Sequence, residues 1–247
     1  MPLLGLIGFP LEHSFSPEYF KEKFKSLQLE DWSYKAFPME NLNELNTFIL
    51  ANPDLMAFNI TIPHKQSILK HCQIISEEVS EIGAANLVVI DRNDNGFQLL
   101  AFNTDYRGFR DSLIGALQSP IRKAAILGNG GSSKAIAFAL KSMDVQYDFI
   151  GRSSDIKYET ADLSNYDLII NCTPIGMWRS DEKQMEEYLP LQYNSIKKGV
   201  LFYDLIYNPE ETSMMKRFSE QGAIVKNGLE MLHLQADIGW DIVNEFI

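Results

Sequence analysis

Apolar and polar positions along the first hundred residues follow the spacing of strands and helices in alternation. Short apolar runs between turn residues predict buried strands, and apolar residues spaced three or four apart predict helices. The predicted strands span 3–9, 32–37, 55–60, 86–90 and 97–102, and the predicted helices span 16–27, 42–51 and 76–82, with one more beginning at 63. An Asn-Gly pair precedes the last strand and is typical of a hairpin, so we expect a mixed sheet with helices.

The remainder of the chain alternates in a second pattern. Its predicted strands span 124–127, 147–150, 168–171, 200–204 and 223–225, and its predicted helices span 105–117, 132–142, 209–221 and 230–246. The segment between 151 and 166 is polar and weakly periodic, and it is close to the shortest length that joins parallel strands, so we expect no full helix there. The pattern predicts an α/β fold with a doubly wound parallel sheet.

Local signals mark where two of these helices begin. Ser16 followed by Pro17 is typical of an N-cap with proline at the first helical position. Pro63 is expected to open a helix in the same way.

A glycine-rich turn follows the predicted strand 124–127. It contains Gly128, Gly130 and Gly131 and leads into the helix that begins near Ser132. Glycines in such a turn let the backbone approach a pyrophosphate, and the free amides of the first helical turn point at it. The spacing is Gly-x-Gly-Gly instead of the full dinucleotide-binding pattern, so a structural corner without a ligand is an alternative interpretation.

Composition narrows the classes of partner. The 247 residues carry a net charge of −11, which disfavours nucleic acid and anionic membrane surfaces as partners. No apolar run is long enough to span a bilayer, and the apolar start at 1–9 is interpreted as a strand instead of a signal peptide. Two distant cysteines and four scattered histidines give no disulfide framework and no metal-ligand set. We therefore expect a cytoplasmic protein without a metal.

The residues after the second strand of a dinucleotide fold usually select the cofactor. An acidic residue there bonds the ribose hydroxyl of NAD, and an arginine accepts the 2′-phosphate of NADP. This chain has Arg152 followed by Ser153 and Ser154, and Asp155 comes late for the NAD role, so NADP is favoured. A surface arginine is the alternative interpretation.

Seven further motifs, in one order along nearly the whole chain, resemble those of the shikimate dehydrogenases. They are Ser14-Phe-Ser-Pro17, Asn59-Ile-Thr-Ile-Pro-His-Lys65, Gly83-Ala-Ala-Asn86, Asn103-Thr-Asp105, Asn171-Cys-Thr-Pro-Ile-Gly-Met177, Tyr203-Asp-Leu-Ile-Tyr207 and Asn227-Gly-Leu-Glu-Met-Leu232 with Gln235. The chain departs from the family pattern at four places, namely Leu87, Ala101-Phe102, Gly151 and Glu230.

The resemblance implies an oxidoreductase that reversibly reduces 3-dehydroshikimate to shikimate with NADP, in chorismate and aromatic amino-acid biosynthesis. It also implies a split substrate domain with a mixed sheet, formed by 1–104 and 228–247, around a Rossmann-like cofactor domain at 105–227. We expect a monomer or a homodimer that acts on small molecules.

The resemblance also implies roles for individual residues. The catalytic pair would be Lys65 and Asp105. The substrate-binding residues would be Ser14, Ser16, Asn59, Thr61, Asn86, Tyr207 and Gln235. The cofactor-binding residues would be Gly128, Asn129, Gly130, Gly131, Ser132, Arg152, Ser153, Thr173, Leu205, Gly228 and Met231.

These residue types suit the implied chemistry. Hydride transfer to a ketone builds negative charge on oxygen, and the ammonium of Lys65 can supply the proton or stabilise the oxyanion, while Asp105 orients the lysine and bonds a substrate hydroxyl. Hydroxyl and amide side chains suit a polyol acid, and no metal is required. Taken singly, Lys65 could be a solvated surface lysine and Asp105 a first-turn acid that favours the helix dipole.

Two other functions stay open at this point. One is a quinate/shikimate dehydrogenase with relaxed choice of substrate or of NAD and NADP. The other is a catalytically silent NADP-binding regulator that kept the fold. Activity with shikimate or quinate, and with NADP or NAD, distinguishes the three.

Overall fold

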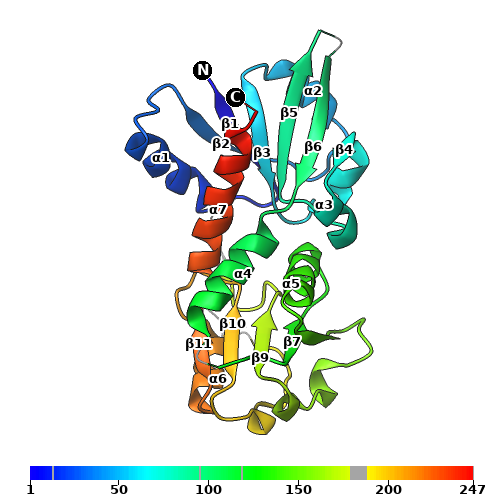
Figure 1. Cartoon of the computed structure of the whole chain (residues 1–247), viewed down its shortest axis with the longest axis vertical. Helices are drawn as coiled ribbons and strands as arrows, with labels where there is room; N and C mark the ends of the chain where they lie inside the picture. The colour runs from blue at the N-terminus through cyan, green and yellow to red at the C-terminus, as the bar shows by residue number, and fades with distance from the viewer. Residues whose placement is uncertain (13, 95, 118, 179–187, 247) are drawn as a thin grey trace. The chain divides into compact units, whose positions relative to one another are not determined.

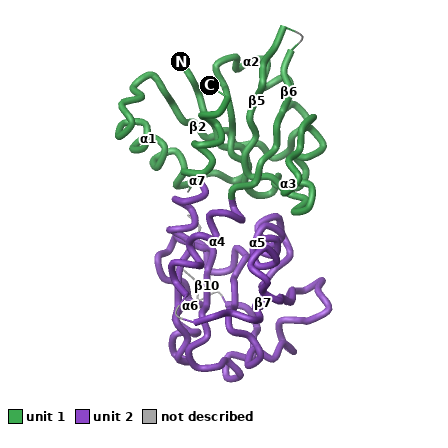
Figure 2. The backbone as a smooth tube through the Cα atoms, viewed as in Figure 1, with its two compact units in different colours: residues 1–104, 236–247 green, residues 105–235 purple. Residues whose placement is uncertain are grey.

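The structure, a computed structural model, describes residues 1–12, 14–94, 96–117, 119–178 and 188–246. The chain divides into two compact units (Figure 2). Unit 1 comprises Met1–Thr104 with Ala236–Ile247, and unit 2 comprises Asp105–Gln235. The domain boundaries expected from the sequence, after 104 and after 227, remain a prediction about the functional domains.

Unit 1 is built on a mixed sheet (Figure 1). Its strands are β1 (Leu3–Gly8), β2 (Ser33–Pro38), β3 (Leu55–Ile60), β4 (Ile74–Ile75), β5 (Leu87–Asn93) and β6 (Gly96–Phe102), in the order β2-β1-β3-β5-β6-β4. Strand β1 runs parallel to β2 and β3, whereas β5 runs antiparallel to both of its neighbours, β3 and β6. The mixed sheet predicted from the hairpin signal is confirmed.

Helices cover both faces of this sheet. They are α1 (Ser16–Ser26), α2 (Leu45–Ala51), the 3₁₀ helix η1 (Ser67–His71), α3 (Glu77–Ile82) and the end of α7 (Leu229–Asn244). Successive strand residues point to opposite faces. Phe58 therefore packs with Leu45 and Ile68 in one buried cluster, while its neighbour Ala57 packs with Phe20 in the other.

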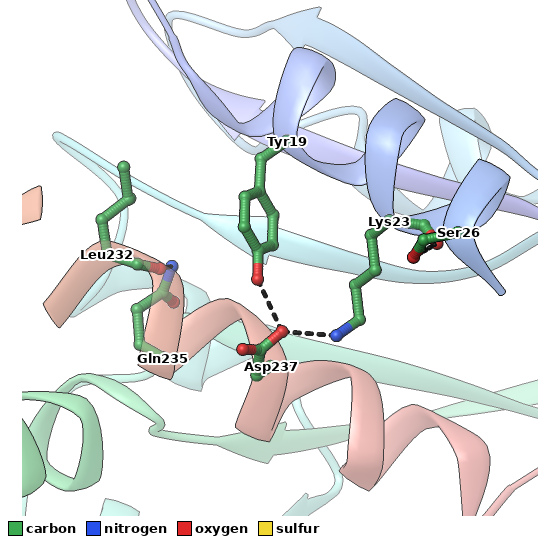
Figure 3. A network of polar contacts seen from close by, with 6 residues as sticks. All are labelled: Tyr19, Lys23, Ser26, Leu232, Gln235 and Asp237. Carbon is green, nitrogen blue, oxygen red and sulfur yellow. Dashed lines mark hydrogen bonds and ion pairs between the residues drawn. The ribbon is translucent and has the colours of Figure 1, made fainter. Parts of the chain in front are cut away.

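Within unit 1, Asp237 of α7 is fastened to α1 by two side chains (Figure 3). The Tyr19 hydroxyl donates a hydrogen bond to Asp237 Oδ1 at 2.5 Å, and the Lys23 ammonium forms an ion pair with the same oxygen. Burial, and then the hydrogen bond and charge of Asp237, raise the pKa of the Tyr19 phenol, which therefore stays a donor. One turn further along α7, Trp240 packs edge-on against Trp32. The last turns of α7 are thus part of the unit 1 core.

Unit 2 holds a fully parallel sheet. Its strands are β7 (Lys123–Leu127), β8 (Gln146–Ile150), β9 (Leu168–Asn171), β10 (Leu201–Asp204) and β11 (Ile224–Lys226), in the order β11-β10-β9-β7-β8. The chain leaves β7 for β8 on one side and then crosses to β9 on the other. This reversal is the topological switch point at which doubly wound sheets bind their ligands, and it confirms the predicted α/β architecture.

Helices α4 (Asp105–Ala116), α5 (Gly131–Ser142) and α6 (Ser213–Glu220) pack on the parallel sheet. Phe202 of β10 stacks on Phe218 of α6, with ring centroids 3.9 Å apart. The next residue, Tyr203, packs on Phe109 of α4 with centroids 5.1 Å apart. Both faces of this sheet are therefore covered, as its continuous apolar strands require.

The segment between β8 and β9 contains only two short 3₁₀ helices, η2 (Tyr158–Thr160) and η3 (Leu163–Asn165). The expectation of no full helix there is confirmed. A third 3₁₀ helix, η4 (Tyr193–Ser195), precedes β10.

The helix predicted to open at Pro63 was wrong. Turns occupy this segment until η1 begins at Ser67. The Lys65 carbonyl accepts a hydrogen bond from the Ala85 amide at 2.7 Å, so it is engaged outside any α-helix. The Leu69 amide bonds instead to Gln66 at 3.4 Å, which is the 3₁₀ spacing.

The predicted N-cap at Ser16 was also wrong. Helix α1 starts at Ser16 itself, with Phe15 at the cap position and no side-chain cap. Two other helices start later than predicted, α2 at Leu45 and α6 at Ser213. The Thr212 hydroxyl caps α6 by accepting from the Met215 amide at 3.1 Å, which fixes that start.

Candidate functional site

Asn86 and Thr104 form the centre of a buried polar cluster in unit 1. The Asn86 Nδ2 donates to Thr104 Oγ1 at 2.9 Å, and the Thr104 amide donates to Asn86 Oδ1 at 2.7 Å. Both residues are buried, at 3% and 0% exposure. The neighbouring Asn103 Nδ2 donates to the Ala84 carbonyl at 2.9 Å. The segments that enter β5 and leave β6 are therefore clamped together, immediately before Asp105.

Asn59, near the end of β3, joins the same cluster. Its Nδ2 donates to the Asn86 carbonyl at 3.2 Å, and the same carbonyl accepts from the Ile60 amide at 2.8 Å. Its Oδ1 accepts a hydrogen bond from the Tyr34 hydroxyl at 2.9 Å. Two of the predicted substrate-binding residues, Asn59 and Asn86, are thus connected.

Sequence reasoning did not single out Tyr34, because a tyrosine in a predicted strand is ordinary. Its place depends on the strand register. Leu4 of β1 pairs with Tyr34 of β2 on one side and with Ala57 of β3 on the other. Asn59 lies two residues beyond Ala57 and shares its face. Only the tertiary pairing reveals that the phenol reaches Asn59.

Lys65 and Thr61 follow β3 on a segment held by backbone bonds. The Thr61 amide donates to the Ile7 carbonyl at 3.0 Å, and the His64 amide donates to the Thr61 carbonyl at 2.9 Å. The buried His64 ring bonds the Met39 carbonyl through Nε2 at 2.7 Å. Because the Lys65 carbonyl is bonded to the Ala85 amide, the lysine is fixed beside the residue that precedes Asn86.

Ser14 lies half-buried in the turn before α1, where its amide donates to the Leu11 carbonyl at 3.1 Å. Gly8 closes the same end of the sheet. A Cβ on Gly8 would come within 2.4 Å of the Thr61 side chain, so only glycine fits there.

The glycine-rich turn of unit 2 lies at the switch point between β7 and β9. Gly128 has φ of +101°, and a Cβ there would lie 3.0 Å from the Thr173 methyl. A glycine is therefore required on conformational grounds, and the turn reaches the loop that follows β9. Gly130 donates to Ser133 Oγ at 3.0 Å at the start of α5, and a Cβ on Gly130 would meet nothing within 4 Å. This open corner with a helix N-terminus fits a phosphate group.

Asp204 is a fully buried carboxylate at the end of β10 that the sequence analysis left without a role. It accepts from Thr212 Oγ1 at 2.7 Å, from Asn171 Nδ2 at 2.9 Å and from the Ile206 amide at 3.1 Å. Burial raises its pKa to about 6, against the lowering effect of these hydrogen bonds. Asn171 in turn accepts from the Thr173 hydroxyl at 2.7 Å. The network fixes the loops that carry Thr173, Leu205 and Tyr207.

Two close backbone approaches bring further candidates together in unit 2. The Gly228 amide donates to the Ile206 carbonyl at 3.0 Å, and a Cβ on Gly228 would lie 2.2 Å from the Leu205 carbonyl oxygen. Gly108 of α4 meets α7 in the same way, where a Cβ would lie 2.8 Å from the Gln235 side chain and 2.9 Å from the Met231 carbonyl. Asp105 lies one helical turn before Gly108 on α4, on the same side of the helix as the contact with Gln235.

A cavity of about 480 Å³ opens beside the glycine-rich turn and includes Asn129, Lys134, Ser153, Ser154 and Asp155 in its lining. The Asn129 Nδ2 donates to Ser153 Oγ at 3.5 Å, which joins the two predicted cofactor loops.

The loop that carries Arg152 is shaped by its own neighbours. Lys157 donates to the carbonyls of Arg152 at 3.0 Å and Ser154 at 2.7 Å, and the Arg152 side chain is exposed. A Cβ on Gly151 would lie 3.0 Å from Ser154 Oγ, so a side chain at this departure from the family pattern would require the Ser154 hydroxyl to shift. Ser154 Oγ is buried without a hydrogen-bond partner among the described residues, so a donor and acceptor is available at the cavity.

The predicted site residues belong to different units. Ser14, Ser16, Asn59, Thr61, Lys65 and Asn86 lie in unit 1, whereas Asp105, Tyr207, Gln235 and all the predicted cofactor residues lie in unit 2. The roles assigned to these residues remain predictions.

Over the residues that the structure describes, no three histidine, cysteine or carboxylate side chains gather as a metal site would require. Nor does any described helix combine the length and the apolar character needed to cross a membrane.

The chain is similar in sequence and in fold to known shikimate dehydrogenases. Residues 6–88 match the family model of the shikimate dehydrogenase substrate binding domain. A shikimate dehydrogenase (NADP⁺) of Clostridium botulinum is 34% identical over 249 residues, which cover 94% of this chain and 92% of the relative. A shikimate dehydrogenase (NADP⁺) of Bacillus cereus is 35% identical over 264 residues, which cover 97% and 91%. The crystal structure of a Thermus thermophilus shikimate 5-dehydrogenase, in complex with NADP(H) and shikimate, superposes with a TM-score of 0.85 at 26% identity and covers 99% of this chain and 94% of that one.

Proposed function

This chain belongs to the shikimate dehydrogenase family, and we propose that it carries out the family's reaction with Lys65 and Asp105 as the catalytic residues. The reaction is the NADP-dependent, reversible reduction of 3-dehydroshikimate to shikimate, in the pathway to chorismate and the aromatic amino acids. The enzyme is an oxidoreductase that acts on a CH–OH group of a small molecule.

The residues of unit 2 fit NADP. The glycine-rich turn, which is open at Gly130, accommodates the pyrophosphate together with the start of α5. Arg152, Ser153 and the unpartnered Ser154 hydroxyl offer donors to the adenosine 2′-phosphate beside the cavity. When bound, the nicotinamide supplies or accepts the hydride.

Lys65 acts at the reacting oxygen. Reduction of the ketone places negative charge on that oxygen, and the Lys65 ammonium donates the proton that neutralises it. In the oxidation direction, the amine of Lys65 takes the proton back from the hydroxyl. Asp105 accepts a hydrogen bond from a substrate hydroxyl.

The polar cluster of unit 1 holds the remaining substrate groups. Ser14, Ser16 and Thr61 bond through hydroxyls, and Asn59 and Asn86 through amides, each in a fixed direction. Tyr207 and Gln235 of unit 2 complete the set of donors and acceptors for the carboxylate and hydroxyls of shikimate.

One observation carries this proposal. The backbone carbonyl of Lys65 accepts a hydrogen bond from the amide of Ala85, which precedes the buried Asn86. The backbone carbonyl of Asn86 in turn accepts a hydrogen bond from Asn59 Nδ2. The backbone at Lys65 is therefore held next to the two predicted substrate amides, which supports an enzyme over a silent regulator.

The test is an activity matrix with shikimate or quinate as substrate and NADP or NAD as cofactor. The proposal expects the highest kcat/KM with shikimate and NADP. Comparable turnover of quinate, or of NAD, would favour the relaxed quinate/shikimate dehydrogenase. The absence of turnover with every pair would favour the NADP-binding regulator.

The proposal extends to partners and location. A net charge of −11 disfavours nucleic acid and anionic membranes as partners, and two cysteines that are not joined in a disulfide suit a reducing compartment. We expect a cytoplasmic monomer or homodimer, with sedimentation analysis as the measurement of its assembly.

A further inference from the structure

We propose that Asp204 is a positioning residue for the cofactor, which holds the loops after β9 and β10 in the arrangement that binds NADP. The inference rests on the proposed function, because NADP is the cofactor of the proposed reaction. Asp204 lies at the end of β10 and is fully buried, so it acts through other residues instead of meeting the cofactor itself.

The first argument is that the two carboxylate oxygens of Asp204 have different tasks. Oδ1 accepts hydrogen bonds from Asn171 Nδ2 at 2.9 Å and from the Ile206 amide at 3.1 Å. Oδ2 accepts from the Thr212 hydroxyl at 2.7 Å, and the same hydroxyl caps α6. One oxygen therefore holds the two loops and the other holds a helix, so the two tasks can be tested separately.

The second argument is that Asn171 links Asp204 to Thr173 and to the glycine-rich turn. A carboxylate oxygen only accepts, so the amide atom that faces Asp204 is Nδ2, and Asn171 Oδ1 is left to accept. Oδ1 accepts from both the backbone amide of Thr173, at 3.0 Å, and its hydroxyl, at 2.7 Å. The hydroxyl is thereby held on Asn171, and the Thr173 methyl group lies 3.0 Å from where a Cβ on Gly128 would be.

These contacts run across neighbouring strands of the parallel sheet. Asp204 and Asn171 are register partners at the ends of β10 and β9, and Gly128 follows β7, which is the next strand in the sheet. Doubly wound sheets bind their ligands outside the carboxyl ends of the strands. Asp204 therefore supports the edge of the sheet at which the cofactor is expected.

The third argument concerns Ile206, which leads to two more predicted cofactor residues. Its amide is held by Asp204, and its carbonyl accepts from the Gly228 amide at 3.0 Å. Gly228 lies so close to Leu205 that a Cβ on it would come within 2.2 Å of the Leu205 carbonyl oxygen. One buried carboxylate thus orders both loops before the cofactor arrives, and ordered loops lose less freedom on binding.

The direct test compares Asn171→Ala with Thr212→Val. Each variant removes one side-chain donor from the same buried carboxylate, but only Asn171 leads to Thr173. The measurement is the Kd for NADP by isothermal titration calorimetry without substrate, at about pH 7.5, where Asp204 is ionised because its pKa is about 6. Asn171→Ala should raise the Kd about tenfold, the equivalent of about 1.4 kcal/mol, and Thr212→Val should change it less than about twofold.

A merely structural role of Asp204 would lower the melting temperature of both variants and change their Kd values equally. Equal changes in Kd, or an unchanged Kd in Asn171→Ala, would overturn the inference. Circular dichroism shows that each variant is folded before its Kd is measured.

Two substitutions at Asp204 itself complete the test. The side-chain carbonyl of Asp204→Asn can keep both bonds of Oδ1 while its NH₂ group donates to the Thr212 oxygen, so the Kd should stay within about threefold of the wild type. Asp204→Ala loses both bonds and should weaken NADP binding at least as much as Asn171→Ala. Equal weakening by Asp204→Asn and Asp204→Ala would overturn the inference, and if Asp204→Ala does not fold, the pair at Asn171 and Thr212 decides.

Binding of NADP is measured without turnover, which separates this inference from the proposed function. A wild type that binds NADP but does not oxidise shikimate would overturn the proposed catalytic function and leave the role of Asp204 standing. A wild type that does not bind NADP would overturn both.

Discussion

Two hydrogen bonds join the side-chain amide of Asn86 to Thr104, and both residues are buried. Asn86 donates to the Thr104 hydroxyl oxygen at 2.9 Å and accepts from the Thr104 backbone amide at 2.7 Å, so the two bonds close a ring. Each partner uses a donor and an acceptor, so replacing either one removes both hydrogen bonds. The ring fixes the chain at the residue before Asp105. The position of Asn86, a predicted substrate-binding residue, and that of the chain just before Asp105, a predicted catalytic residue, therefore depend on each other.

Replacing Asn86 with alanine should reduce both stability and activity. The Thr104 amide and hydroxyl would lose their partner in a buried environment, which costs about 1–3 kcal/mol. Urea unfolding should show a loss of this size, and the KM for shikimate should rise. Asn43→Ala, at an exposed amide of the same unit, should change the free energy of unfolding by less than about 0.5 kcal/mol. Equal losses in the two variants would contradict the account.

Replacing Arg152 with alanine should weaken NADP selectively. Arg152 is exposed and precedes Ser153 and Ser154, which line the cavity, and in the proposed function it donates to the 2′-phosphate. The KM for NADP should rise roughly tenfold or more, the worth of a charge-assisted hydrogen bond, while the KM for NAD stays nearly constant.

Arg122→Ala removes another exposed arginine of unit 2 and serves as the control, with no expected effect on either cofactor. If Arg152→Ala raised both KM values equally, the arginine would have no role in choosing between the cofactors.

Asp204 should impose a pH dependence on stability that is opposite to the usual acid destabilisation. Its folded-state pKa of about 6 lies above the usual value near 3.8, so the folded state binds the proton more tightly. The contribution to stability is complete below pH ~4 and is lost as pH rises through 6, by up to roughly 3 kcal/mol.

The measurement compares wild type with Asp204→Asn, which stays neutral at every pH. The free energy of unfolding of the variant relative to wild type should increase between pH 4.5 and 7.5. A difference that is constant over this range would show that Asp204 does not titrate as described. The comparison cancels the contributions of all other carboxylates and histidines.

Local sequence patterns predicted most elements of this fold, because apolar residues recur every two residues in a half-buried strand and about every 3.6 residues in an amphipathic helix. These patterns predicted the structure less well where a hydrogen bond to a residue distant in sequence competes with a local hydrogen bond. The helix expected at Pro63 gives way because the Lys65 carbonyl bonds to Ala85, and the sequence carries no sign of that partner. The cap expected at Ser16 fails because the helix begins one residue earlier, which places Phe15 at the cap position.

In the candidate site, too, some residues could be predicted from the sequence and others could not. Residues such as Lys65, Asn86 and Gly128 stand in motifs that can be read from the chain alone. Tyr34 and Asp204 contribute through partners that are distant in sequence, Asn59 in one case and Asn171 in the other. Strand register and loop packing determine those pairs, and neither is encoded in a short motif.

The steady-state kinetics of Lys65→Ala with shikimate and NADP test the central claim most directly. If Lys65 donates the proton in the chemical step, kcat should fall by roughly 10²- to 10⁴-fold while the KM for shikimate changes much less. Lys70→Ala, an exposed lysine on η1, should behave as the wild type. A Lys65→Ala enzyme with near-normal kcat and a large rise in KM would contradict the assignment and make Lys65 a binding residue.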